Sequence, residues 1–256
     1  MPPPGYREFE FDLPQALLIN LVRAFDSMEG ASLMPDLVTA IPEAQGVYQL
    51  FHQGALVYIG KTDAQAGLRE RLTRHAWTVQ HRKNLDPAQV SFKAIRVFVF
   101  TAIDLETQLI QHYRASGPVA WNFSGFGSND PGRERDTTNI KPEGFDAQFP
   151  VDLDRKVVLD VASPAFASEA LTALRRALPY TFRFESAGRG SRKPHPDLEE
   201  AAVSLPSRVF TTRELLVHIA RSLPPGWQAT LLAGRVILYK ENREYPFGEV
   251  IVRSGS

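Results

Sequence analysis

Arg71 and His75 place a cation and an imidazole four residues apart in a predicted helix, Gly67–Gln80. At this spacing the two side chains stack along one side of the helix, at the edge of its apolar stripe. Arg69 falls about 160° away from Arg71 on the same helix, so only Arg71 can share a cleft with His75. A titratable imidazole beside a fixed positive charge permits general acid–base chemistry. The spacing by itself favours the alternative, a solvated Arg/His pair on a surface helix.

Glu106 places a carboxylate in line with an apolar stripe. Its helical neighbours are Leu109, Ile110 and Tyr113. A carboxylate in this position loses hydration and needs a cation, a hydrogen-bond network or a proton as compensation. A structural ion pair with an arginine and a divalent-metal site both satisfy that need. A single glutamate is chemically sufficient for Mg²⁺, which commonly takes one or two carboxylates together with waters and phosphate oxygens.

The stretch GALVYIGKT, Gly54–Thr62, ends in a triplet that also closes nucleotide-binding phosphate loops. Such a loop needs G-x-x-x-x-G-K-[ST], because backbone N–H groups at glycine-permitted positions curl around the phosphates. Here Ala55 replaces the first glycine, and Leu56–Ile59 are large apolar residues that favour a buried strand. We therefore expect no nucleotide cofactor, and the triplet marks the end of a strand that carries Tyr58.

Composition limits the setting in which these residues act. The chain has 256 residues, is 43% hydrophobic and contains no cysteine. The absence of cysteine excludes disulfides, thiolate metal sites and cysteine nucleophiles. No apolar run approaches the roughly 18 residues of a membrane span, and the N-terminus lacks an apolar signal core. We expect a cytoplasmic protein with no membrane partner.

Charge is unevenly distributed, although the formal net charge is zero. Between Lys61 and Arg96 the chain carries eight lysines and arginines against three acidic residues. A polar loop, SNDPGRERD, follows at Ser128–Asp136, and a basic glycine-rich stretch, AGRGSRKPH, lies at Ala187–His195. A solvated, flexible loop is the simpler interpretation of the last stretch.

Hydrophobic periodicity predicts the elements that position these residues. The first half reads as an amphipathic helix, Gln15–Phe25, then a hairpin of strands Gly46–Phe51 and Leu56–Gly60, the helix Gly67–Gln80, a strand Phe92–Phe100 and a helix Leu105–Ala115. The second half reads as strand Lys156–Val161, helix Ala165–Ala177, strand Tyr180–Glu185, a helix capped at Thr211 or Thr212, and strands Gln228–Leu232 and Val236–Tyr239. We expect an α+β protein of three segments: an N-terminal helical arm (residues 1–36), a catalytic core (37–145) and a C-terminal α+β extension (146–256) that serves DNA recognition or supports a dimer.

The triplets Gly46-Val47-Tyr48 and Tyr58-Ile59-Gly60, on the two strands of the hairpin, resemble the signature of the GIY-YIG nuclease superfamily. Valine replaces the usual isoleucine at position 47. The resemblance continues in order through Arg71 and His75, Glu106 and Asn122, and covers roughly residues 40–140. The stretch Trp121–Asp136, WNFSGFGSNDPGRERD, is similar to the type II restriction endonucleases of that superfamily.

The resemblance implies a core of a small antiparallel sheet flanked by helices, and a role for each matched residue. Tyr48 would take a proton from the attacking water, Tyr58 would position the water and the scissile phosphate, and Arg71 would neutralise charge on that phosphate. Glu106 would hold one Mg²⁺, for which Mn²⁺ substitutes. His75 and Asn122 complete the expected catalytic set, with Asn122 holding geometry through hydrogen bonds.

A phenol with a reference pKa of about 10 is a weak base near neutrality. We expect Arg71, Lys61, a protonatable His75 and the metal ion to favour the phenolate of Tyr48, or His75 to pass the proton onward. Asn122 is uncharged and has a second interpretation as an ordinary turn residue.

The implied activity is hydrolysis of double-stranded DNA at a short palindromic site by a homodimer, or by a tetramer built from dimers. Lys61, Asn129, Arg133 and Arg135 are the candidates for contacting DNA, because arginine suits guanine and asparagine suits adenine. Phosphate anchoring is an equal interpretation for the arginines. The alternatives are a homing or repair nuclease of the same superfamily, and a catalytically inactive DNA-binding module.

Overall fold

The computed structural model describes residues 3–10, 12–62, 66–98, 104–127 and 130–255. Its contacts group the chain into two compact units. The first contains Met1–Ala76 and Pro87–Asn122, and the second contains Trp77–Asp86 and Phe123–Ser256. This grouping differs from the three expected segments: the N-terminal arm belongs to the first unit, and residues 123–145 belong to the second.

The first unit is built on a four-stranded antiparallel sheet with the strand order β1-β4-β2-β3. The strands are β1 (Ala31–Ser32), β2 (Gly46–His52), β3 (Ala55–Lys61) and β4 (Val90–Arg96). Gln53 and Gly54 form the two-residue loop between β2 and β3, both with positive φ (53° and 80°). Such loops match the twist of a hairpin. A register shift between Leu50 and Phe51 then moves the pairing by one residue, so that Tyr48 lies opposite Gly60.

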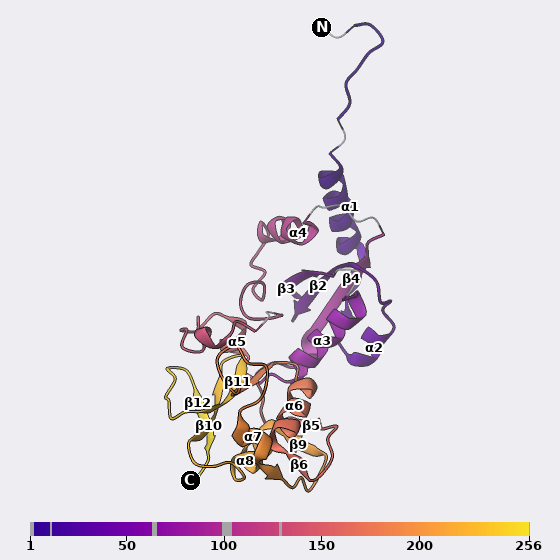
Figure 1. The fold of residues 1–256 in the computed structure, drawn as a ribbon. Coiled ribbons are helices and arrows are strands. Elements are labelled where there is room, and N and C mark those ends of the chain that lie inside the picture. The colour runs from indigo at the N-terminus through magenta and orange to yellow at the C-terminus, as the bar shows by residue number, and fades with distance from the viewer. Residues whose placement is uncertain (1–2, 11, 63–65, 99–103, 128–129, 256) are drawn as a thin grey trace. The chain divides into compact units, whose positions relative to one another are not determined.

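Helices cover both faces of this sheet, as Figure 1 shows. They are α1 (Leu13–Ser27), α2 (Pro35–Thr39), α3 (Leu68–Gln80) and α4 (Leu105–Arg114). Successive side chains of a strand point to opposite faces. Val47 therefore packs with α1 and α4, and its neighbour Tyr48 points to α3. Helix α1 buries Leu21 and Phe25 in this core, so its apolar stripe packs within its own chain.

The second unit contains a four-stranded sheet with the order β12-β10-β11-β7, in which β7 runs parallel to β11 and the other pairs are antiparallel. Its strands are β7 (Thr181–Phe184), β10 (Trp227–Leu232), β11 (Arg235–Lys240) and β12 (Glu249–Arg253). Two short pairs accompany it: β5 (Lys156–Val158) with β9 (Val209–Thr211), and β6 (Ala165–Phe166) with β8 (Ala202–Val203). The helices are α5 (Phe145–Gln148), α6 (Ala167–Ala177), α7 (Pro196–Glu200) and α8 (Thr212–Ala220).

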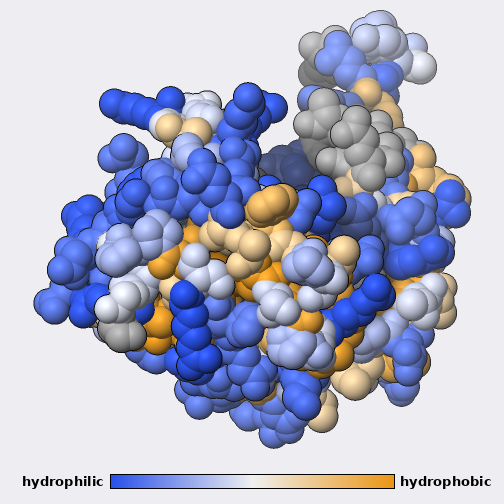
Figure 2. All heavy atoms as spheres, turned by 60° about the horizontal axis from the view of Figure 1, so that its bottom comes forward, coloured by the Kyte–Doolittle hydropathy of each residue, from blue (hydrophilic) through white to orange (hydrophobic). Residues whose placement is uncertain are grey.

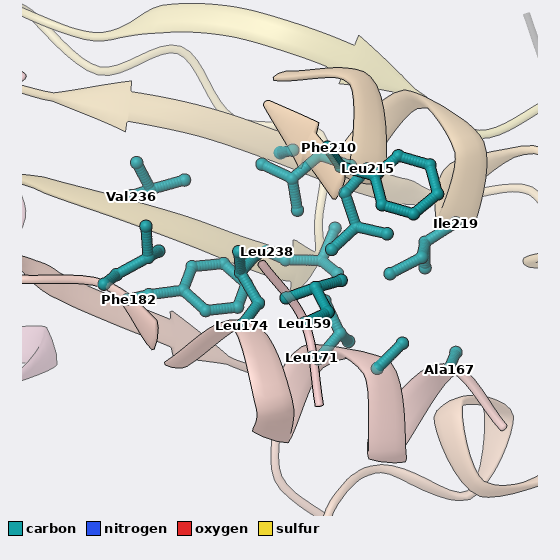
Figure 3. Packing of buried hydrophobic residues seen from close by; sticks show 14 of the residues in the cluster. Leu159, Ala167, Leu171, Leu174, Phe182, Phe210, Leu215, Ile219, Val236 and Leu238 are labelled. Atoms are coloured by element: carbon teal, nitrogen blue, oxygen red, sulfur yellow. The ribbon is translucent and has the colours of Figure 1, made fainter. Parts of the chain in front are cut away.

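A continuous apolar core fills the second unit (Figure 3). Leu171 and Leu174 of α6 meet Phe182 of β7 and Leu238 of β11 there. Helix α8 begins at the predicted cap: Thr211 accepts a hydrogen bond from the backbone N–H of Glu214, whose carboxylate accepts one from the N–H of Thr211. This capping box satisfies two backbone donors that the first turn leaves unpaired.

The predicted fold class is confirmed at the level of a mixed α+β protein with small, mainly antiparallel sheets. The predicted strand Lys156–Val161 ends at Val158. The predicted strand Phe92–Phe100 corresponds to β4, which ends at Arg96, and residues 99–100 of the predicted range lie outside the described residues. None of the helices in the described ranges has the length and apolar character that crossing a membrane requires. Figure 2 shows a face on which hydrophilic side chains predominate around a smaller apolar area.

Candidate active site in the first unit

Tyr48 and His75 form a buried hydrogen-bonded pair. Strand β2 points Tyr48 at helix α3, where its hydroxyl oxygen lies 2.7 Å from Nε2 of His75. Each residue is only 2% exposed. Burial, reinforced by the nearby charges of Arg71 and Arg74, lowers the pKa of His75 to about 3. The imidazole is therefore neutral at pH 7, and the tautomer of His75 decides which of the two atoms donates the hydrogen bond.

Tyr58 completes a cluster of three rings. Its ring centroid lies 6.1 Å from that of Tyr48 and 5.4 Å from that of His75. Burial raises the pKa of Tyr48 well above its ordinary value, and the neighbouring Tyr58 raises it further. Burial is also the main cause that raises the pKa of Tyr58, and the negative charge of Glu106 raises this pKa further. Both tyrosines are thus neutral phenols in the free protein.

In the free protein, burial outweighs the positive charges that would favour the phenolate of Tyr48. Arg71 does lower the pKa of Tyr48, but desolvation of the phenolate is the larger effect. His75 contributes no positive charge at neutral pH, because the same burial keeps it unprotonated. In the free protein, Tyr48 and His75 are therefore a neutral hydrogen-bonded pair.

Gly60 makes room for the reactive end of Tyr48. The two residues face each other across the β2–β3 ladder. A Cβ atom placed on Gly60 would lie 2.4 Å from both Cζ and the hydroxyl oxygen of Tyr48, closer than any real Cβ contact. Gly46 is similarly restricted, because its Cβ would lie 2.2 Å from the carbonyl oxygen of Ile95. The glycine of the Gly-Lys-Thr triplet therefore accommodates the tyrosine ring of the neighbouring strand.

Arg71 joins the cluster from the turn of α3 that precedes His75. Its Nε is buried and has no hydrogen-bond partner within the described ranges of the chain. A buried donor without a partner carries a desolvation cost, which a bound oxygen acceptor would offset. Arg69 is directed elsewhere: its Nε donates to the carbonyl oxygen of Ile41 at 2.7 Å. The helical geometry thus brings Arg71, and not Arg69, to the tyrosines.

Glu106 lies in the first turn of α4, behind the N-cap residue Asp104. The side chain is partly buried, and burial is the main cause that raises the pKa of its carboxyl group. Lys61 and Arg71 lower that pKa through their charges. Among the cations that the structure describes, none lies within 4.0 Å of the Glu106 carboxylate. A structural ion pair, the alternative left open by the sequence, is not formed here.

Lys61 is held at the end of β3 by Asp104. Its Nζ lies 2.8 Å from Oδ1 of Asp104, and both side chains are about half exposed, at 50% and 55%. An ion pair this exposed contributes little to stability. Asp104 was not among the predicted site residues, although an aspartate directly before a helical apolar pattern is a recognisable N-cap signal.

Asn122 clamps the strand that carries Tyr58. Its Oδ1 accepts a hydrogen bond from the backbone N–H of Ile59, and its Nδ2 donates to the carbonyl oxygen of Ile59, both at 2.9 Å. Ile59 lies on β3, the edge strand of the sheet, whose outer backbone groups would otherwise lack partners. Asn122 therefore holds the backbone of β3 through two hydrogen bonds, and it also lies in a turn, as the second interpretation had it.

The predicted DNA-contacting residues of the polar loop belong to the second unit. Arg133 pairs with Glu185 at 2.7 Å and Glu241 at 3.5 Å, so its charge is compensated within the unit. Arg135 is exposed, and its carbonyl oxygen accepts a hydrogen bond from Arg235. Asn129 lies outside the described residues.

The donor set of the first unit is compatible with Mg²⁺ only if the substrate supplies further oxygens. The described residues contain no group of three or more histidine, cysteine, aspartate or glutamate side chains placed to hold a metal ion. Glu106 offers one carboxylate that is partly desolvated and has no close cation. One carboxylate with waters and phosphate oxygens is an ordinary Mg²⁺ environment.

Comparison of the sequence with known proteins identifies no family for the chain. Neither a protein-family model nor a curated protein matches this sequence. A functional assignment must therefore rest on the cluster of Tyr48, Tyr58, Arg71, His75 and Glu106.

Proposed function

We propose that the chain is a metal-dependent nuclease that hydrolyses phosphodiester bonds in double-stranded DNA, and that its first unit is a GIY-YIG core. One observation carries the proposal. The hydroxyl of Tyr48 lies 2.7 Å from His75 Nε2, in a cluster where the charges of Arg71 and Glu106 both act on the pKa of that tyrosine. The small antiparallel sheet flanked by helices also fits this core.

The Tyr48–His75 pair supplies a route for the proton of an attacking water. As water adds to phosphorus, its proton passes to the hydroxyl oxygen of Tyr48, and the proton of that hydroxyl passes to Nε2 of His75. The hydroxyl is thereby restored and the imidazole becomes cationic, so the phenolate never needs to form in the free protein. Cleavage of the bond between phosphorus and the 3′ oxygen leaves a 5′-phosphate, and the released 3′ oxygen takes a proton from solvent water to become a hydroxyl.

Arg71 and a metal ion held by Glu106 would stabilise the negative charge of the phosphate. The buried Nε–H of Arg71 can donate to a non-bridging oxygen, which satisfies a donor that is otherwise unpaired. Glu106 would hold a Mg²⁺ or Mn²⁺ ion together with substrate oxygens, and that ion would supply Lewis acidity at the phosphate. The Tyr58 ring lies 6.1 Å from the Tyr48 ring, and the charges of Glu106 and Arg71 act on its hydroxyl, so it can orient water in this cluster.

Within this class, we propose a type II restriction endonuclease that acts in the cytoplasm as a homodimer or a dimer-based tetramer. Each chain offers one such cluster, enough to cut one strand. The two target phosphates of a palindrome are related by a two-fold axis, which a homodimer shares. The similarity of Trp121–Asp136 to restriction enzymes supports this choice over a homing or repair nuclease.

The test is cleavage of plasmid and genomic DNA in Mg²⁺ by the purified full-length chain, with sequencing of the ends produced. Wild-type protein should give discrete fragments with 5′-phosphates, and Glu106→Gln should reduce the rate by orders of magnitude while DNA binding survives. Glu70→Gln is the matched control, since Glu70 is an exposed glutamate in the first turn of α3. Random nicking would favour a repair nuclease. DNA binding without cleavage in either Mg²⁺ or Mn²⁺ would favour an inactive binding module.

A further inference from the structure

The second unit contains an open pocket of about 480 Å³ with a basic lining. It lies between the C-terminal end of α6, strand β7, strand β11 and the loop that follows β7. Its cationic side chains are Arg133, Arg175, Arg183, Arg192 and Lys193, and Glu185 is the only acidic residue among the residues that line it.

Two of these five cations are compensated inside the unit. Arg133 pairs with Glu185 and with Glu241, and its guanidinium also lies 4.0 Å above the centre of the Tyr239 ring. Arg183 pairs with Asp130 at 3.3 Å and also with Asp136. These ion pairs compensate the charges of Arg133 and Arg183, so the two arginines offer little net charge to a ligand.

The other three cations have no acidic partner among the residues that the structure describes. Within the described parts of the chain, no carboxylate lies within 4.0 Å of the charged groups of Arg175, Arg192 or Lys193. The guanidinium of Arg175 lies 5.1 Å from the centre of the Phe184 ring, and its side chain is exposed. Arg192 and Lys193 are exposed as well. The pocket therefore presents about three uncompensated positive charges.

The loop that carries Arg192 and Lys193 is closed by backbone hydrogen bonds. The N–H of Ala187 donates to the carbonyl oxygen of Lys193 at 3.0 Å, and the N–H of His195 donates to that of Glu185 at 3.1 Å. The N–H of Lys193 also donates to Oγ of Ser191. The basic side chains thus project from an internally bonded loop, so less conformational entropy is lost when they bind.

We propose that this pocket binds the phosphate backbone of double-stranded DNA, a contact additional to the one at the tyrosine cluster. That the ligand is DNA rests on the proposed nuclease function. That the pocket contacts phosphate groups rests on the uncompensated cations that line it. Guanidinium forks match phosphate oxygens, and lysine adds a point charge. A duplex carries one negative charge per ~1.7 Å, so it can engage several of these cations together. The contact positions the duplex without reading its sequence.

The experiment measures binding of the full-length chain to a fluorescent DNA duplex, without divalent metal, over a range of salt concentrations. The test variant combines Arg175→Gln, Arg192→Gln and Lys193→Gln. The matched control combines Lys156→Gln, Arg208→Gln and Arg221→Gln, which removes the same number of exposed arginines and lysines from the same unit, away from the pocket. A double variant, Arg192→Gln with Lys193→Gln, changes only the loop, so it tests the pocket even if the change in α6 impairs folding.

Log affinity falls with log salt concentration, and each phosphate contact contributes about 0.9 to the magnitude of that slope. The triple variant should therefore reduce the magnitude of the slope by about 2 to 3. The same relation predicts at least about a tenfold loss of affinity near 0.1 M salt. The control should retain wild-type affinity and slope. Equal binding by wild type and the triple variant would overturn the inference while leaving cleavage, and the proposed function, intact.

The remaining outcomes separate the two proposals. Wild type that binds DNA through the pocket but cuts nothing in Mg²⁺ or Mn²⁺ would support the inference and defeat the nuclease. Wild type that does not bind duplex DNA would overturn the inference. Inorganic phosphate or ATP that binds the wild type but not the triple variant, while DNA binding is unchanged, would also overturn it in favour of a small anion.

Discussion

The Gly60→Ala substitution tests whether the position of the Tyr48 hydroxyl controls activity. The added Cβ would lie 2.4 Å from Cζ and from the hydroxyl oxygen, where an ordinary contact begins at 3.4 Å. The ring must therefore move by about 1 Å, and a displacement of about 1 Å at a reacting group costs on the order of 10²-fold in rate. Because the ring is buried against His75, overpacking should also lower the free energy of unfolding by about 1–3 kcal/mol.

The assay for this substitution combines a plasmid cleavage time course with thermal unfolding. Gly117→Ala is the control, because a Cβ there has no heavy atom within 4 Å and the residue does not have a positive φ. That variant should cut at the wild-type rate and should unfold at the wild-type temperature or slightly above. A Gly60→Ala protein that kept both wild-type cleavage and wild-type stability would refute the link between this glycine and the tyrosine.

The remaining predictions test the other groups of the site and the assembly. Tyr48→Phe should reduce cleavage by about 10²–10⁴-fold, because it removes the proton relay; Tyr113→Phe, which loses a hydroxyl contact to a carboxylate in the same unit, should leave the rate unchanged. Arg71→Ala should lower the rate by about 10²-fold or more, as for other donors to a developing anion, whereas Arg69→Ala should not; the reverse result would refute the assignment of helical faces. Sedimentation should show a dimer or tetramer that linearises a one-site plasmid with little nicked circle, and a monomer releasing mainly nicked circle would exclude the restriction enzyme. His75 has a folded pKa of about 3, below its unfolded value of about 6.5, so its protonation favours the unfolded chain. The contribution of neutral His75 to the free energy of unfolding should be complete above pH 6.5 and should fall by up to roughly 5 kcal/mol as the pH decreases toward 3. Chemical denaturation of wild type and His75→Gln should therefore show a difference in the free energy of unfolding that narrows over that range.

Local patterns were enough to predict the elements that hold the site. The hairpin has a short glycine-containing loop between two apolar runs, and α3 has a clear apolar stripe, so both could be located within one or two residues. The four-residue spacing of Arg71 and His75 also placed them correctly on one side of α3. These features depend on backbone geometry that neighbouring residues determine.

Contacts between distant segments could not be predicted in the same way. The double hydrogen bond of Asn122 to Ile59 joins residues 63 positions apart, and nothing near Asn122 in the sequence indicates its partner. Strand β12 was missed because it pairs with β10, not with its sequence neighbour β11, and all its residues are at least partly exposed. The pKa of Tyr48 was expected to fall because the sequence lists nearby charges but does not reveal burial.

The opposite pKa shifts of Tyr48 and His75 have one cause and one consequence for the proposed reaction. Burial opposes charge on either group, so it raises the pKa of the phenol and lowers that of the imidazole. The neutral pair is therefore strongly favoured in the free protein, and proton transfer from one to the other is unfavourable there. Arg71 and Arg74 add to this barrier, since their charges lower the pKa of His75 further. A phosphodiester bound beside Arg71 carries the charge that offsets this contribution, so the imidazole should become a better proton acceptor when a substrate phosphate is present. The arginine that lowers the basicity of His75 in the free protein is thus the group through which the substrate would restore it.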